Sequence, residues 1–176
     1  TEKSVYGIAI DIGTTTLAAE LISLTDGICL KTASSVNHQR AYGADVISRI
    51  RAAASGDAEK LRESILKDVR NLAETLLAGQ DENVLNVSKI VIAGNTTMIH
   101  LLLGYSCVGL GAAPFTPVNL APEDMTWGEL NGEYEETRES GDARESGDAK
   151  ESGVARDGSD AREHGYVREC GHTGIN

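Results

Sequence analysis

The segment DIGTTT, near the start of the chain, combines an acid, a glycine and three threonines. Gly13 allows the backbone to turn tightly and to come close to a ligand. The amide N–H groups and hydroxyls of Thr14, Thr15 and Thr16 can then donate to phosphate oxygens. Asp11 can hold Mg²⁺ through water or orient an attacking water molecule. These residue types in one turn predict a phosphate-binding site suited to phosphoryl transfer.

The residues after this turn separate it from other phosphate loops. A P-loop or a Rossmann loop is followed by a helix, and neither GxGxxG nor GxxxxGK[ST] occurs in this sequence. Here an apolar, strand-like stretch follows at 17–24, so the turn is predicted to close a β-hairpin. The alternative is an ordinary hairpin in which Asp and Gly serve only the turn. The order of the surrounding elements favours phosphate binding.

A second candidate turn is formed by Gly94, Asn95, Thr96 and Thr97. It joins a predicted strand to a predicted helix, so its polar groups can face a cleft at the carboxyl end of the strand. The alternative is a helix cap, in which Asn95 or Thr96 accepts from free N–H groups at the helix start. For this segment taken alone, the cap is the better interpretation.

Hydrophobic periodicity predicts the elements that must position both turns. The expected order is β-β-β-α-α-β-α, with strands at 5–10, 17–24, 28–33 and 89–93 and helices at 42–54, 58–78 and 96–103. This order predicts an α/β fold with helices packed on a sheet.

The two longer helices are predicted to be amphipathic. In the first, apolar residues share one face, and in the second a longer stripe recurs at helical spacing. These residues are Val46, Ile47, Ile50 and Ala54 in the first, and Leu61, Ile65, Val69, Leu72 and Leu76 in the second. Asp57 is expected to cap the second helix and Gly79 to end it. His38 is expected in a loop, and His100 as a packed helix residue.

Composition excludes several classes of protein. The 176 residues carry a formal net charge of -11, which argues against binding to nucleic acid or to an anionic membrane surface. No apolar run approaches the roughly 20 residues of a membrane span. The chain has an odd number of cysteines, and Cys29, Cys107 and Cys170 are widely spaced. Such a set suits a reducing cytoplasm better than a disulfide scaffold. The chain does not begin with Met, which suggests a piece of a longer protein.

Composition also divides the chain into two regions, 1–130 and 131–176. The second holds 12 acidic and 6 basic residues, hence a net charge of -6. It also contains a series of six-residue repeats, of which the first is RESGDA. A hexapeptide β-helix would need a bulky apolar residue in each turn, and these units mostly offer Ala or Asp. We therefore expect a disordered segment. His164, Cys170 and His172 lie close together in it and form a weak candidate metal site.

Four stretches resemble one known family. They are GIAIDIGTTT (7–16), YGADVISRI (42–50), IAGNTTMIHLLLG (92–104) and APFTPV (113–118). Together they are similar to the C-terminal ATPase domain of the reductive activators of corrinoid proteins, over about residues 5–122. The first stretch is shared by all actin-like ATPases, whereas the other three together are far more specific.

The resemblance implies an actin-like, ribonuclease H-like lobe that binds ATP and Mg²⁺ together with a second lobe. Such proteins use ATP to reduce the Co(II) of a corrinoid protein to Co(I) for methyl transfer. Their electron comes from a [2Fe-2S] domain earlier in the same chain. Asp11, Gly13 and Thr14 to Thr16 match the first phosphate motif, and Gly94 to Thr97 match a second cleft-facing turn.

Three features depart from the family pattern. No cysteine-rich region precedes Thr1, the repeats stand where the second lobe's phosphate and adenosine motifs are expected, and Asn37-His38-Gln39 replaces Asn-Pro-Gln. The chain is therefore expected to be an incomplete first lobe that is inactive alone, with an open sheet edge that favours a homodimer. Alternatives are a non-catalytic folding or interaction module and a small-molecule kinase of the same superfamily.

The composition break leads to a prediction for limited proteolysis. Trypsin should cut first within residues 138–173, because a polar repeat cannot bury enough apolar area to protect its backbone. Residues 1–130 should remain intact for longer, which mass spectrometry of the early fragments would show. First cuts within residues 1–100, with the repeats intact, would contradict this division.

Overall fold

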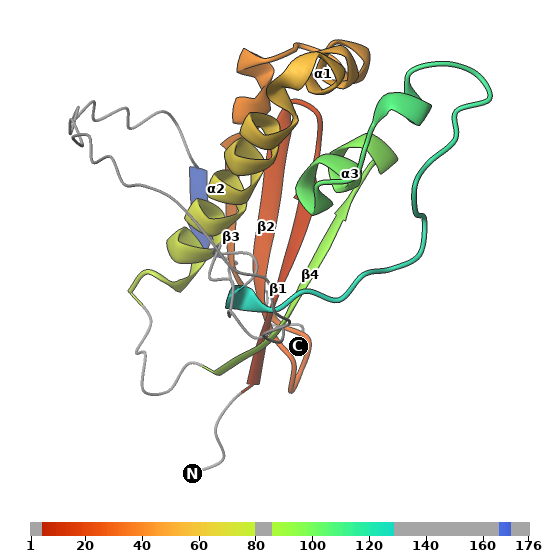
Figure 1. Ribbon diagram of the computed structural model, residues 1–176. Coiled ribbons are helices and arrows are strands. Elements are labelled where there is room, and N and C mark those ends of the chain that lie inside the picture. The colour runs from red at the N-terminus through yellow and green to blue at the C-terminus, as the bar shows by residue number, and fades with distance from the viewer. Residues whose placement is uncertain (1–4, 80–85, 129–165, 170–176) are drawn as a thin grey trace, which may run out of the picture.

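The computed structural model describes residues 5–79, 86–128 and 166–169, which form a sheet with helices on one face (Figure 1). The strands are β1 (Val5–Ile12), β2 (Thr16–Ser23), β3 (Cys29–Val36), β4 (Asn86–Gly94) and β5 (Tyr166–Glu169). The helices are η1 (His38–Ala41), α1 (Val46–Ala52), η2 (Ala53–Asp57), α2 (Ala58–Leu77), α3 (Thr96–Leu103) and η3 (Val108–Leu110). The predicted order of the first seven main elements is confirmed.

The sheet has the order β4-β1-β2-β3-β5. β1 and β2 form the predicted hairpin, with Asp11 opposite Ala18. β4 returns parallel to β1 on its other side, with Asp11 beside Ala93 and Ile12 beside Gly94. The ends of β1 and β4 therefore lie side by side, which brings the two candidate turns to one edge of the sheet.

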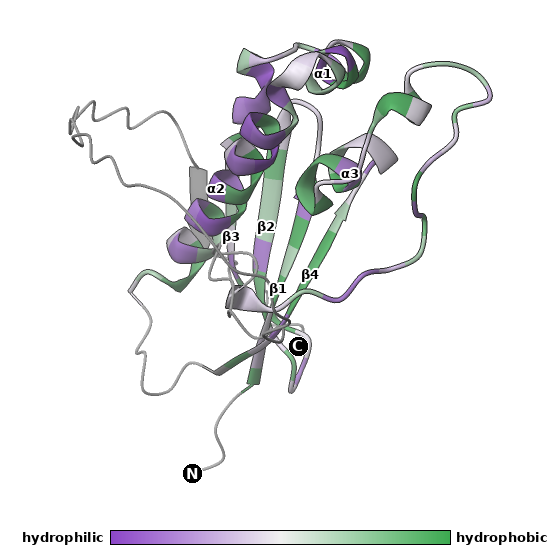
Figure 2. Ribbon diagram, in the orientation of Figure 1, coloured by the Kyte–Doolittle hydropathy of each residue, from purple (hydrophilic) through white to green (hydrophobic). Residues whose placement is uncertain are grey.

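The core lies between the sheet and helices α2 and α3. In Figure 1, α2 crosses β2 and β3, whereas α3 lies over β1 and β4. Ile8, Ile10 and Ile12 alternate along β1 and are all buried, as expected for a strand with one face on helices. The predicted stripe of α2 is also buried, and Figure 2 shows its polar side turned outward. Lys31 donates to the carbonyls of Thr75 and Ala78, which satisfies groups at the carboxyl end of α2.

The predicted helix at 42–54 differs from the structure in its buried face. α1 begins after Asp45, whose carboxylate accepts from the Ser48 N–H at 2.7 Å. Ile47 is 43% exposed, whereas Arg49 is fully buried beside Ile50. The expectation that Ile47 and Ala54 face the core is therefore wrong, because a polar site inside the fold takes the Arg49 side chain instead.

The start of α2 also differs from the expectation. The side chain of Asp57 makes no capping hydrogen bond, because the chain enters α2 directly from the π-helical turn η2. Asp57 instead forms an ion pair with Lys60 at 2.8 Å. At the other end, Gly79 has φ +80°, which agrees with a glycine that ends the helix.

One short strand comes from the acidic second region. β5 pairs antiparallel with β3, with Ala33 opposite residue 167, so the expected disorder does not hold for residues 166–169. The other repeats lie outside the described residues, as do His164, Cys170 and His172. For them, disorder and metal binding stay predictions.

At the opposite side of the sheet, no described strand pairs with the outer edge of β4. A groove of about 1010 Å³ runs along this edge, between β4, the end of α3 and the segment 120–127. Val91 and Leu120 are exposed apolar residues of its lining. The groove agrees with the expectation of an open sheet edge in the described residues.

None of the described helices is long and apolar enough to cross a membrane. The two cysteines of the described residues differ in state. Cys29 is disulfide-bonded, which differs from the expectation of a cysteine set suited to a reducing compartment, whereas Cys107 is a free, buried thiol.

The burial of Cys107 leads to a prediction about its reactivity. Desolvation raises the pKa of this thiol to about 11, because the thiolate loses its hydration inside the fold. Alkylation needs the thiolate, so iodoacetamide should modify Cys107 at pH 8 at least about tenfold more slowly in the folded protein than in denaturant. The rate should keep rising with pH up to about 11, followed by mass spectrometry of the Cys107 peptide. A plateau near pH 9 would show an ordinary, accessible thiol.

Candidate phosphate-binding site

Asp11 lies one residue before the end of β1, which is paired with β4 on one side and with β2 on the other. Its side chain is exposed and stands between Ala18 and Ala93, whose methyl groups leave space around the carboxylate. Within the described part of the chain, the Asp11 carboxylate has no hydrogen bond or ion pair. A free carboxylate at the carboxyl end of parallel strands is suited to holding a hydrated cation or a water molecule.

The turn between β1 and β2 is tight. The Gly13 N–H donates to the carbonyl of Thr16 at 3.0 Å. A Cβ atom on Gly13 would lie 2.5 Å from that carbonyl oxygen, so a larger residue would force the turn to open. Thr15 and Thr16 are exposed and Thr14 is half-buried, so these hydroxyls lie at or near the surface.

Three consecutive carbonyl groups of this turn are bound from the protein side. The side-chain amide of Asn37 donates to the Gly13 carbonyl at 2.8 Å, and the Asn37 N–H donates to the Thr15 carbonyl at 2.8 Å. The guanidinium of Arg49 donates to the Thr14 carbonyl at 2.5 Å. These contacts fix the backbone of the turn from beneath.

Arg49 belongs to a small polar cluster inside the fold, together with Asn37 and Gln39, and all three side chains are fully buried. Arg49 Nε donates to the Gly43 carbonyl at 2.9 Å, and Nη1 lies 3.3 Å from both Gln39 Oε1 and Met98 Sδ. Gln39 in turn donates to the Leu61 carbonyl of α2. Burial lowers the pKa of the Arg49 guanidinium, because a charged group is costly to desolvate.

The second candidate turn lies directly beside the first. Asn95 Nδ2 contacts Thr14 Oγ1 at 3.3 Å, while Asn95 Oδ1 accepts from the Met98 N–H at 3.0 Å. Asn95 is therefore both the cap of α3 and a bridge between the turns. A Cβ atom on Gly94 would lie 3.0 Å from the Ile12 carbonyl, so glycine allows the close approach of the two strand ends.

The predicted site residues of the second turn differ in their exposure to solvent. Asn95 and Thr96 are exposed at the shared edge with Asp11. Thr97 is buried in α3, so its hydroxyl is not presented at the surface. The helical turn of about 100° per residue explains the difference, because it rotates Thr97 toward the core next to Met98.

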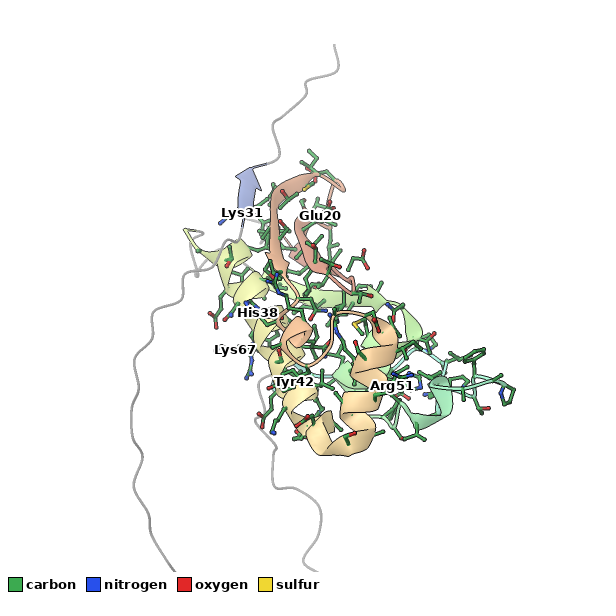
Figure 3. The ribbon with its side chains drawn as sticks, turned by 90° about the horizontal axis from the view of Figure 1, so that it is seen from above. Glu20, Lys31, His38, Tyr42, Arg51 and Lys67 are labelled. Atoms are coloured by element: carbon green, nitrogen blue, oxygen red, sulfur yellow. The ribbon has the colours of Figure 1, made fainter. Side chains whose placement is uncertain are left out.

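Two histidines have structural partners. His38 Nδ1 lies 2.6 Å from Asp68 Oδ1, and the His38 N–H donates to Asp68 Oδ2 at 2.9 Å, which ties η1 to α2. Figure 3 shows His38 on the α2 side of the sheet, near Lys67. His100 is buried, as predicted, and its Nε2 accepts from the Val118 N–H at 3.0 Å, which anchors the loop after η3.

The residues that support the turn were not predicted as site residues. Asn37 and Gln39 were noted only through the family pattern, and Arg49 only as part of the YGADVISRI stretch. A signal for Arg49 exists in the sequence, because its position falls between Val46 and Ile50 on the apolar face of α1. A charged residue at such a position indicates a buried polar partner.

The arrangement can present donors to an anion and a carboxylate to a metal. Within the described residues, no group of three or more His, Cys, Asp and Glu side chains could hold a metal directly. Asp11 alone fits a magnesium ion that keeps most of its water ligands and takes others from phosphate. The role of the turn in binding phosphate and magnesium stays a prediction.

Comparisons with known proteins agree with the motifs. Residues 6–138 match the family model for the RACo middle region, which confirms the resemblance to the reductive activators of corrinoid proteins. The chain is 38% identical over 116 residues to the corrinoid activation enzyme RamQ of Eubacterium limosum, covering 65% of this chain and 20% of that protein.

A solved structure is also similar. It is a reductive activator for corrinoid, iron–sulfur protein, with a TM-score of 0.61 and 39% sequence identity, covering 67% of this chain and 19% of that one. The chain thus spans about a fifth of the length of each relative. Because the family model matches most of the chain, the chain belongs to the RACo middle region family.

Proposed function

We propose that this chain supplies one half of an ATP site, in which the turn at 13–16 binds phosphate and Asp11 holds Mg²⁺ through water. The single observation that carries this proposal is the contact between Asn95 Nδ2 and Thr14 Oγ1. It joins two polar turns from distant parts of the sequence at one sheet edge, next to a free carboxylate. A hairpin that served only as a turn would need no such partner.

The architecture supports an actin-like, ribonuclease H-like lobe. Three antiparallel strands are followed by helices and by a strand parallel to the first, and the candidate turns lie at the carboxyl ends of β1 and β4. Ligands of open α/β sheets generally bind at such strand ends. The proposed nucleotide would lie between this lobe and a second one, which would supply the adenosine pocket.

At the level of the whole protein, the proposed function is ATP-dependent reductive activation of a corrinoid protein. The two relatives are named for corrinoid activation and for a reductive activator of a corrinoid, iron–sulfur protein. The proposed reaction returns Co(II) to Co(I), with an electron from a [2Fe-2S] domain of the complete protein and a corrinoid protein as partner. Residues of this chain would bind the phosphates and orient the metal.

One observation favours a second candidate, an interaction module. The groove beside β4 is lined mainly by apolar residues and follows an unpaired strand edge in the described part of the chain. Such an edge can pair with another strand, including that of a second copy. No feature of the described site supports the small-molecule kinase.

The proposed role of Asp11 is tested by Asp11→Ala in a full-length protein that contains this region. We expect ATP turnover to be abolished, because the variant loses the carboxylate that orients magnesium. The free energy of unfolding should change by no more than about 1 kcal/mol, since Asp11 is exposed and unpaired in the described part of the chain.

The matched control is Glu20→Ala, which removes an exposed acid from β2 (Figure 3). Glu20→Ala should retain turnover. Steady-state ATPase assays and chemical denaturation give both quantities. Normal turnover in Asp11→Ala would remove Asp11 from the mechanism.

The chain alone should bind Mg-ATP no more tightly than about millimolar. A half-site leaves the phosphate contacts in water, where charge interactions are weak and screened by salt. The net charge of -11 adds repulsion, and the described turn offers no apolar slot for adenine. Isothermal titration calorimetry measures the affinity. A micromolar isotherm would show that the site is already complete, for example in a dimer.

A further inference from the structure

Arg49 is a fully buried cation without a described anionic partner. Its guanidinium contacts two backbone carbonyls, one amide oxygen and one thioether sulfur, all of them neutral. Asp45, the exposed cap of α1, acts on it electrostatically but forms no ion pair with it. Burying an arginine is costly unless a nearby negative charge compensates it. This imbalance needs an explanation beyond packing.

The position of Arg49 connects the buried charge to the proposed phosphate turn. Arg49 binds the Thr14 carbonyl and Asn37 binds the Gly13 carbonyl from the protein side. In a trans peptide the carbonyl and the following N–H lie in one plane and point in opposite directions. Drawing these two carbonyls inward therefore turns the N–H groups of Thr14 and Thr15 outward. Neither N–H donates to another described residue.

We propose that Arg49 is a positioning residue whose buried positive charge is balanced by the phosphate bound on the other side of the turn. The inference rests on the proposed function, since it identifies the missing counter-charge as the ligand itself. Arg49 does not touch the phosphate in this arrangement. It acts through the Thr14 peptide group, which it polarises and orients, and through its field, which the low-polarity interior screens only weakly.

Nuclear magnetic resonance of the ¹⁵N-labelled chain tests this inference without any substitution. The probes are Mg-ATP and magnesium tripolyphosphate, added up to tens of millimolar. The amide signals of Gly13, Thr14 and Thr15 should shift, and the Arg49 Nε–H signal should shift with the same midpoint. The corresponding signal of Arg51 should not move, because Arg51 is exposed on α1 (Figure 3).

Two substitutions separate charge from hydrogen-bond geometry. Arg49→Gln removes the charge and should weaken tripolyphosphate binding at least about tenfold, whereas Arg49→Lys keeps the charge and should remain within about threefold of the wild type. Arg51→Gln is the matched control on the same helix and should bind within about twofold of the wild type. Circular dichroism and the dispersion of the amide signals establish that each variant is folded.

The outcomes distinguish this inference from the function on which it rests. If the turn amides of the wild type shift but the Arg49 signal does not, or if folded Arg49→Gln binds as the wild type does, the role of Arg49 is overturned. If Arg49→Gln does not fold, the role of Arg49 is still tested by the shift of the wild-type Arg49 Nε–H signal and by the tripolyphosphate affinity of Arg49→Lys. If no amide of the turn responds in the wild type, the proposed phosphate site fails, and this inference fails with it.

Discussion

The candidate site depends on how the first turn is held from below. Three successive carbonyl oxygens of the turn accept from Asn37 and Arg49, which are fully buried. Buried polar groups need partners, so each member of this cluster constrains the others. Gln39 joins the cluster to α2 through the Leu61 carbonyl, and Asn95 joins the turn to α3. The turn therefore has a fixed shape that both helices help to set.

The parallel pairing of β1 with β4 is the second constraint. It places Ile12 beside Gly94, and the absence of a side chain on Gly94 lets the two strand ends approach closely. As a result, a turn from residues 13–16 and a turn from residues 94–97 share one edge of the sheet. The alternation along β1 sends Ile10 and Ile12 into the core and leaves Asp11 on the exposed face. Along β1, the candidate site residue Asp11 therefore lies on one face of the sheet, and the core residues Ile10 and Ile12 lie on the other.

The two long edges of the sheet differ. β3 is paired with the short strand β5, which comes from the acidic region, whereas β4 borders an apolar groove. The family model covers most of the chain, but the relatives are about five times longer. In the proposed function, the second half of the ATP site would come from the longer protein.

Local patterns in the sequence were enough for the elements and for the exposed part of the site. Apolar runs predicted β1 to β4, the stripe of α2 predicted its buried face, and the residue types of Gly13 and Asn95 predicted the tight turn and the helix cap. These features depend on periodicity and on short-range sterics, which the sequence carries directly. The motif residues could therefore be named without knowing which strands pair.

The tertiary structure decided the features that depend on distant partners. Arg49 was hidden in an apolar pattern, and only the fold shows that it replaces Ile47 on the buried face because the Thr14 carbonyl lies beneath α1. The pairing of β5 with β3 also follows from a neighbour far away in the sequence. A buried charge or a strand at a sheet edge is stabilised by groups that local sequence does not specify. For this reason the sequence by itself determined the elements and the motif residues, and the fold determined what supports them.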